Sequence, residues 1–254
     1  PEEIGTNVPT EVALIGDGQA VMAQINRALD ENPWQYPPET VWRSGISNRI
    51  EENRLTTLQM AHDDTAPMNY YRALRDIRDM MPRDAILASE GASTMDIGRQ
   101  VLPNFDARTR LDAGTYGTMG VGLGFAIAAA VTNPGRRIIC LEGDSAFGFS
   151  GMEVETACRH KLPITFIILN NNGIGGGPDE LPTDRPYPPG AYTPDARYER
   201  VIEAFGGQGF YVSDPAELRP ALQKALESPM PTIVNVDISN RAARKPQAFT
   251  WHTT

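Results

Sequence analysis

The sequence of 254 residues has few cysteines, no long apolar run and no excess of positive charge. Cys140 and Cys158 are too few for a disulfide scaffold or a zinc site, and their apolar or helical surroundings predict buried structural thiols. No apolar stretch reaches the roughly 18 residues of a membrane span. The net charge of −9, without a basic stripe, argues against a nucleic-acid surface. We therefore expect a cytoplasmic protein, and the start at Pro1 suggests a piece of a longer one.

What the sequence does contain is a central βαβ pattern in residues 141–177. The apolar run Arg137–Leu141 predicts a buried strand that leads to Gly143-Asp144-Ser145, and the run Ile164–Leu169 predicts a second strand that leads to Asn170-Asn171-Asn172. A helix-forming segment lies between them. The carboxyl ends of neighbouring parallel strands lie side by side, and open α/β sheets bind ligands there. A carboxylate, a carboxamide and the backbone carbonyl of Gly173 suit Mg²⁺, which takes its remaining ligands from phosphate and water.

The surrounding residues 68–238 predict one α/β domain, a parallel sheet with helices on both faces. Asn69 and Asp214 stand where N-caps of two helices are expected. The predicted strands are residues 85–89, 137–141, 164–169, 210–212 and 232–238, and the predicted helices are residues 70–81, 95–101, 125–131, 198–205 and 215–226.

The first 67 residues do not complete a domain of their own. A strand at Glu11–Ile15 followed by a helix at Gln19–Leu29 reads as the last βα unit of a Rossmann-like domain, residues 1–33, whose remainder is absent. Residues 34–67 read as a linker that is proline-broken and aromatic at Trp34–Trp42 and helical at Glu51–His62. Gly16-Asp17-Gly18 lacks a following Asn-Asn pair at the required distance, so we interpret it as a simple turn.

Two further loops are expected to meet the central unit at the same sheet edge. They are Glu90–Thr94 and the glycine-dense stretch Gly114–Gly124. Glycine lets the backbone approach an anion closely, and the helix N-termini after Ser93 and Ser145 offer unpaired N–H groups to phosphate. Glycine-rich turns alone are common in α/β proteins, but together with Asp144 and Asn171 they predict a magnesium-diphosphate site.

These motifs resemble a known family. Gly-Asp-Ser, residues 146–169 and Asn-Asn in succession match the thiamine diphosphate signature. The segments SEGASTMDIG, RLDAGTYGTMGVGLGFAIAAAV, EGDSAFGFSGMEVETACR and NNNGI are similar to 2-hydroxyacyl-CoA lyases and to the related oxalyl-CoA decarboxylases. The resemblance implies a carbon–carbon lyase that reversibly cleaves a 2-hydroxyacyl-CoA to formyl-CoA and an aldehyde with thiamine diphosphate and Mg²⁺. An oxalyl-CoA decarboxylase and a non-catalytic subunit that retains the cofactor fold are the alternatives.

The resemblance also implies residue roles. Asp144, Asn171 and the carbonyl of Gly173 would bind Mg²⁺. Met119 would be an apolar wedge under the bent cofactor, and the backbone of Gly117 and Met119 would hold the aminopyrimidine, which makes these two the implied catalytic positions. The residues implied to line the diphosphate are Ala92, Ser93, Gly143, Ser145, Ala146 and Ile174.

The sequence departs from the family in two respects. The family draws its activating glutamate from an N-terminal pyrimidine-binding domain that this chain lacks, and Glu90, Glu142 and Glu153 belong to the other half of the site. We therefore expect the chain to need that N-terminal portion, with active sites between protomers of a dimer or tetramer. Gly175 stands where relatives usually carry a tyrosine that faces the substrate, which predicts a roomier pocket.

Candidates for contact with the acyl-CoA substrate are few. Arg99, Arg244 and Lys245 are candidates for the CoA phosphates, and Phe249 or Trp251 for covering the thioester. His252 would act as an acid or base if the tail, residues 239–254, folded over the site as a lid. The alternative is a solvated basic tail.

Overall fold

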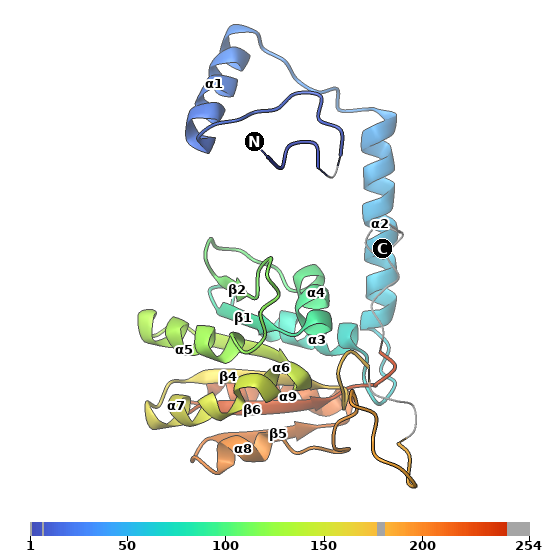
Figure 1. Ribbon diagram of the computed structural model, residues 1–254, viewed down its shortest axis with the longest axis vertical. Helices are drawn as coiled ribbons and strands as arrows, with labels where there is room; N and C mark the ends of the chain where they lie inside the picture. Colours follow the sequence, from blue (N-terminus) through green and yellow to red (C-terminus); the bar gives the residue numbers. More distant parts are fainter. Residues whose placement is uncertain (1, 7, 177–180, 243–254) are drawn as a thin grey trace. The chain divides into compact units, whose positions relative to one another are not determined.

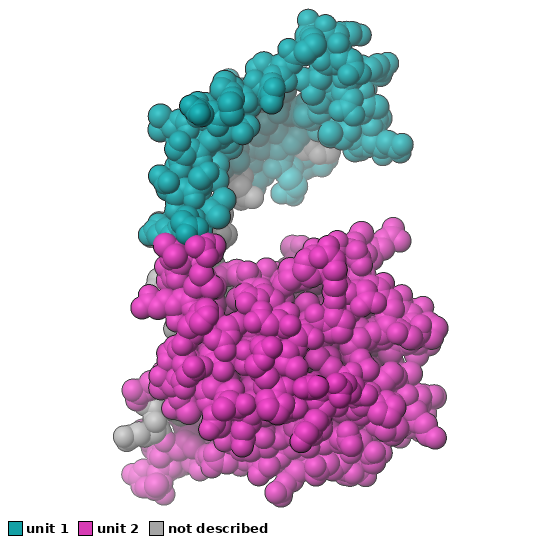
Figure 2. Space-filling model, turned by 180° about the vertical axis from the view of Figure 1, so that it is seen from behind, with its two compact units in different colours: residues 1–52 teal, residues 53–254 magenta. Residues whose placement is uncertain are grey.

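The computed structural model describes residues 2–6, 8–176 and 181–242. The chain divides into two compact units, residues 1–52 and residues 53–254 (Figure 2). The boundary falls within helix α2 (Val41–Ala61). All the residues of the predicted site that are described belong to the second unit.

The first unit is helical where it is regular. Helix α1 (Gly18–Glu31) begins at Asp17, whose carboxylate accepts the N–H of Ala20 at 3.0 Å, so Gly16-Asp17-Gly18 is a turn with a helix cap. The strand predicted at Glu11–Ile15 is wrong, because these residues form no strand and their apolar side chains are exposed. A strand is stable only when its N–H and C=O groups pair with a neighbouring strand, and the described part of residues 1–52 contains none. Helix α2 starts at Val41, ten residues before the helix predicted from Glu51.

The second unit is built on a six-stranded sheet in which every pairing is parallel. The strand order is β2-β1-β3-β4-β6-β5. The short edge strand β2 was not predicted as a strand, and the others lie within a few residues of their predicted positions. The strands are β1 (Ile86–Glu90), β2 (Arg110–Asp112), β3 (Ile138–Gly143), β4 (Ile164–Asn170), β5 (Gln208–Val212) and β6 (Thr232–Asp237).

Helices cover both faces of this sheet, as predicted (Figure 1). One face packs against α3 (Tyr70–Met80), α4 (Ala92–Val101) and α9 (Pro215–Glu227). The other packs against α5 (Gly122–Thr132), α6 (Asp144–Ser150), α7 (Val154–Arg159) and α8 (Glu199–Glu203), with the 3₁₀ turn Gly151–Glu153 between α6 and α7.

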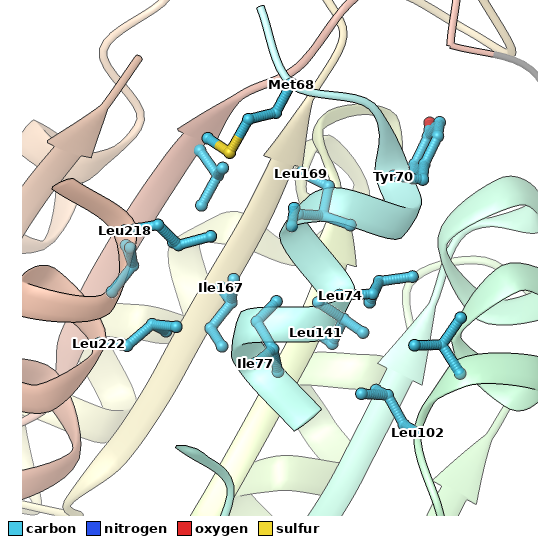
Figure 3. Close-up of a cluster of buried hydrophobic side chains, with 14 of the residues drawn as sticks. Met68, Tyr70, Leu74, Ile77, Leu102, Leu141, Ile167, Leu169, Leu218 and Leu222 are labelled. Atoms are coloured by element: carbon cyan, nitrogen blue, oxygen red, sulfur yellow. The ribbon is translucent and has the colours of Figure 1, made fainter. Parts of the chain in front are cut away.

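The apolar core explains why these helices form where they do. Leu74 and Ile77 repeat at helical spacing on α3, and both pack into the cluster that contains Leu141 of β3 (Figure 3). The central strands β3 and β4 are buried along nearly their whole length because helices cover both of their faces. The predicted buried thiols are confirmed, since Cys140 and Cys158 are both free and buried.

Helix ends follow the predicted caps. Asn69 accepts the N–H of Arg72 at 2.9 Å at the start of α3, and Asp214 accepts the N–H of Ala216 at 2.8 Å at the start of α9. None of the helices in the described part of the chain is long and apolar enough to cross a membrane.

Candidate functional site

A cavity of about 270 Å³ lies at the carboxyl edge of the sheet. It brings together every residue predicted to bind cofactor or metal except Gly117, and it adds Gly175. Its lining comes from Gly91 and the first turn of α4, from the end of β3 and from α6, from the segment after β4, and from single residues before α5 and at the start of α3. The lining residues are Tyr70, Gly91, Ala92, Ser93, Thr94, Met119, Gly143, Asp144, Ser145, Ala146, Phe149, Asn171, Gly173, Ile174 and Gly175.

Asp144 and Asn171 meet because β3 and β4 are neighbours in register. Gly143 pairs with Leu169, so Asp144 follows directly after one strand and Asn171 follows just beyond the other. Both residues are buried, with 2% and 3% of their surface exposed. The Asp144 carboxylate accepts the N–H of Ser145 at 2.8 Å on Oδ1 and the N–H of Gly173 at 2.9 Å on Oδ2. These bonds tie the start of α6 to the segment after β4.

The electrostatics of Asp144 favour a bound cation. Burial raises the pKa of Asp144 to about 6, although hydrogen bonds from the N–H groups of Ser145 and Gly173 oppose the shift. No Lys, Arg or His is among the described residues that line the cavity, so no side chain there compensates the charge. A buried carboxylate without a counter-charge is costly, and a bound cation removes that cost.

The carboxamide of Asn171 is oriented by its own hydrogen bonds. Its Nδ2 donates to the Tyr70 hydroxyl at 3.3 Å and to the Gly175 carbonyl at 3.1 Å. Because the NH₂ group is directed at these two acceptors, the side-chain oxygen of Asn171 is directed away from them. A carboxylate oxygen and a carboxamide oxygen are suitable ligands for a hard cation. The described residues contain no cluster of three or more His, Cys, Asp or Glu, so an ion here needs further ligands from backbone, water or phosphate.

Glycines let the loops of the site approach one another. A Cβ on Gly91 would lie 3.3 Å from the Gly143 nitrogen, and the φ of Gly91 is +97°, which disfavours any other residue. A Cβ on Gly143 would lie 3.2 Å from the Thr94 hydroxyl. Because these glycines have no side chain, the N-termini of α4 and α6 can both lie beside the cavity, where their first-turn N–H groups suit an anion.

The two implied catalytic positions are separated by the structure. Met119 lines the cavity, whereas Gly117 is an exposed residue of the same loop with φ +61° and is not part of the lining. The loop therefore brings Met119 to the cavity that Asp144 and Asn171 also line, and it leaves Gly117 outside that lining.

Three tyrosine or phenylalanine residues belong to the site but were not predicted. Tyr70 and Phe149 line the cavity. Tyr192 donates from its hydroxyl to the Ser145 hydroxyl at 3.1 Å and from its backbone N–H to the Asn172 carbonyl at 3.1 Å. Tyr70 and Tyr192 lie far from the central motif in the sequence, so no local pattern identifies them. Phe149 is mostly exposed and lies within the central motif, residues 141–177, so its position on α6 could have identified it.

The substrate candidates are distributed unevenly. Gly175 lines the cavity with φ +76°, a conformation that a tyrosine rarely adopts. Arg99 lies two helical turns from the start of α4 and outside the lining, where its guanidinium contacts Asp112 at 2.9 Å. The remaining candidates, Arg244, Lys245, Phe249, Trp251 and His252, lie outside the described residues.

A pair of buried acids beneath the site gives a prediction for stability. Glu90 and Glu142 are partners in the β1–β3 register, and both are fully buried. Burial and, next, the charge of Glu90 raise the pKa of Glu142 to about 8. Between roughly pH 4.3, its pKa when unfolded, and pH 8, the unfolded chain releases a proton that the folded chain keeps, so stability falls as pH rises.

We therefore expect Glu142→Gln to flatten this pH dependence. The variant should be more stable than the wild type by about 1–3 kcal/mol at pH 8 and no more stable at pH 4. Denaturant unfolding from pH 4 to pH 8 measures the two slopes. Parallel slopes for the two proteins would contradict the elevated pKa.

Comparison with known proteins identifies the family of this chain. Residues 90–236 match the family model described as thiamine pyrophosphate enzyme, C-terminal TPP binding domain. Thiamine pyrophosphate is thiamine diphosphate, and the chain belongs to this family of thiamine diphosphate enzymes, as its motifs predicted.

The most informative relatives are acyl-CoA enzymes. Human 2-hydroxyacyl-CoA lyase 1 is 47% identical over 99% of this chain and 46% of its own length. Oxalyl-CoA decarboxylase of Escherichia coli K12 is 41% identical over 95% of this chain and 43% of its own length. The chain thus spans about half the length of the curated relatives it matches.

A solved structure shows the same fold. It is the thiamine diphosphate-dependent 4-hydroxybenzoylformate decarboxylase of Rhodococcus jostii, with a TM-score of 0.60 and 23% identity over 70% of this chain and 34% of that chain. The parallel sheet with helices on both faces is therefore the thiamine diphosphate-binding fold that the sequence predicted.

Proposed function

We propose that this chain supplies the diphosphate-binding half of a carbon–carbon lyase. The enzyme cleaves a 2-hydroxyacyl-CoA to formyl-CoA and an aldehyde, and reverses this reaction by condensation, with thiamine diphosphate and Mg²⁺. The observation that carries the proposal is the single cavity that joins Asp144, Asn171 and Met119. The 47% identity to human 2-hydroxyacyl-CoA lyase 1 supports the choice of substrate.

The residues of the cavity fit the cofactor's charged end. Asp144, the Asn171 side-chain oxygen and the Gly173 carbonyl would hold Mg²⁺, since these oxygens suit a hard cation. The diphosphate would lie at the N-termini of α4 and α6, where backbone N–H groups favour anions. The residues proposed to line it are Ala92, Ser93, Gly143, Ser145, Ala146 and Ile174.

Bound thiamine diphosphate supplies the carbon nucleophile and electron sink that acyl cleavage needs. The contribution of this chain is to hold and orient it. Met119 would contact the ring system, and the backbone of Gly117 and Met119 would hold the aminopyrimidine. Phe149 and Ile174, mostly exposed at the cavity, offer apolar surface that would exclude water once the rest of the enzyme covers them.

The size of the cavity supports the proposal of a second component. Its volume of about 270 Å³ falls just below the range of about 300–1,000 Å³ of complete small-molecule sites. We propose that the N-terminal portion of the same enzyme supplies the pyrimidine-binding half and the activating glutamate, in a homodimer or homotetramer. Residues 1–33 would then end a Rossmann-like domain, and residues 34–67 would link it to residues 68–238. A cytoplasmic location stays a prediction from the sequence.

Oxalyl-CoA decarboxylase is the second candidate, because the enzyme of Escherichia coli is 41% identical over nearly all of this chain. Both activities release formyl-CoA, but the lyase also releases an aldehyde, whereas the decarboxylase releases carbon dioxide. The complete enzyme with thiamine diphosphate and Mg²⁺ is supplied with a 2-hydroxyacyl-CoA or with oxalyl-CoA. We expect aldehyde release with a kcat/KM at least about tenfold above that for oxalyl-CoA, a discrimination of about 1.4 kcal/mol. A preference for oxalyl-CoA with release of carbon dioxide would overturn the lyase assignment.

A further inference from the structure

Glu90 is a buried carboxylate with an unusual set of partners. It is the last residue of β1 and is fully buried. Oε1 accepts the N–H of Gly120 at 2.6 Å, and Oε2 accepts the N–H groups of Val121 at 2.8 Å and Gly122 at 2.6 Å. Three consecutive backbone N–H groups, some thirty residues away in the sequence, thus converge on one side chain.

These N–H groups belong to the entry into α5. The first N–H groups of a helix have no partner within it, and the N-cap residue Val121 has no side chain that can accept them. Glu90 supplies that cap from another element, and its negative charge suits the positive end of the helix dipole.

The backbone of Gly122 packs closely against both buried acids. A Cβ on Gly122 would lie 2.0 Å from Glu142 Oε1 and 3.1 Å from Glu90 Cβ. The first turn of α5 therefore rests directly on the two acids at the ends of β1 and β3. Glu90 can keep its three bonds only while the backbone of residues 120–122 stays in this place.

The residue just before this anchored segment is Met119, which lines the cavity. The rest of its loop is rich in glycine, and Gly114, Gly117 and Gly120 all have positive φ. Glycine loses more conformational entropy on ordering than any other residue, so such a loop holds one conformation only if its ends are fixed. Glu90 fixes the end that carries Met119.

We propose that Glu90 is a positioning residue of the cofactor site. By holding the N–H groups of Gly120, Val121 and Gly122, its carboxylate sets how far Met119 projects into the cavity. Glu90 itself is absent from the cavity lining and acts through this backbone. The inference deepens the proposed function, on which it rests.

The test uses Glu90→Gln in the complete enzyme. Glutamine fits the same space, but its NH₂ group cannot accept a hydrogen bond, so one of the two acceptor positions is lost. The matched control is Glu142→Gln, a change of the same kind in the register partner, which bonds to none of the three N–H groups.

Two readouts, each compared between the variant and its control, separate positioning from general destabilisation. We expect Glu90→Gln to lower kcat by about 10- to 100-fold, the effect of misplacing a ligand by about an ångström. The affinity for inorganic pyrophosphate with Mg²⁺, measured by calorimetry, should stay within about twofold because the Asp144 side of the site is intact. Glu142→Gln should leave both quantities within about threefold of the wild type.

A double variant identifies the path of the effect. If Glu90 acts through Met119, the kcat of the double variant Glu90→Gln/Met119→Ala should lie within about threefold of the kcat of the slower single variant. Two results would overturn the role of Glu90, provided that the wild type binds thiamine diphosphate. One is a double variant whose kcat falls by the product of the two single effects, and the other is a Glu90→Gln variant with the same kcat as Glu142→Gln. A wild-type complete enzyme that binds no thiamine diphosphate would overturn the proposed function and this inference together.

Discussion

Replacing Asp144 by alanine is expected to weaken the Mg²⁺-dependent binding of thiamine diphosphate by at least about 100-fold. Asp144 is the one carboxylate among the described residues of the cavity lining, and it is buried. Without it, a divalent cation would have only neutral protein oxygens, and loss even of the groups that support metal ligands typically costs about 10- to 100-fold in metal affinity.

The measurement is the shift in melting temperature that the cofactor causes in the complete enzyme. A ligand that binds the folded state stabilises it according to its concentration relative to its dissociation constant, so weaker binding makes the shift smaller. Asp96→Ala is a suitable control, because Asp96 lies on α4 outside the cavity lining, where it contacts Arg99 at 3.7 Å. If Asp144→Ala kept the full shift, the assignment of Asp144 as a metal ligand would be refuted.

Replacing Asp76 by alanine is expected to cost about 3–5 kcal/mol of stability. Asp76 of α3 is fully buried and contacts Arg72 at 2.6 Å, Arg75 at 3.1 Å and Arg219 of α9 at 3.3 Å. Burial by itself raises the pKa of Asp76, but the hydrogen bonds and charges of Arg72 and Arg75 lower it overall. The carboxylate therefore joins two helices on one face of the sheet, and its removal leaves the buried Arg72 with the largely exposed Asp64 as its remaining carboxylate partner.

Denaturant unfolding measures this loss, with Asp79→Ala as the matched control. Asp79 lies on the same helix and pairs with Arg78 at 2.8 Å, but its side chain is 38% exposed. Solvent screens such a pair, so we expect a change of at most about 0.5–1 kcal/mol. Because the folded pKa of Asp76 is below its unfolded value, its contribution is present above the unfolded pKa of about 3.9 and is lost as pH falls through the folded pKa. Equal losses for the two variants would show that the buried network does not stabilise the fold.

Much of the fold could be predicted because its signals are local. The apolar runs at Arg137–Leu141 and Ile164–Leu169 predict buried strands. Asn69 and Asp214 indicate helix starts because their side chains can accept the first N–H groups of a helix. Tertiary contacts decide where such local signals fail. The segment Glu11–Ile15, apolar after its first residue, suggests a strand, but a strand needs a partner, and the described part of residues 1–52 offers none.

The sequence by itself determined that Asp144 and Asn171 belong to one site. Asp144 and Asn171 each follow a strand, and neighbouring parallel strands bring their carboxyl ends together, so spacing along the chain was enough to bring both residues to one cavity. Only the tertiary structure brought in Tyr70, Tyr192 and Glu90, whose hydrogen bonds join segments roughly 30 to 100 residues apart. Such contacts depend on strand order and on the packing of α3 and α5 against the sheet. The chain's local pattern does not encode these, because a hydrogen bond requires two groups to meet in space, wherever they stand in the sequence.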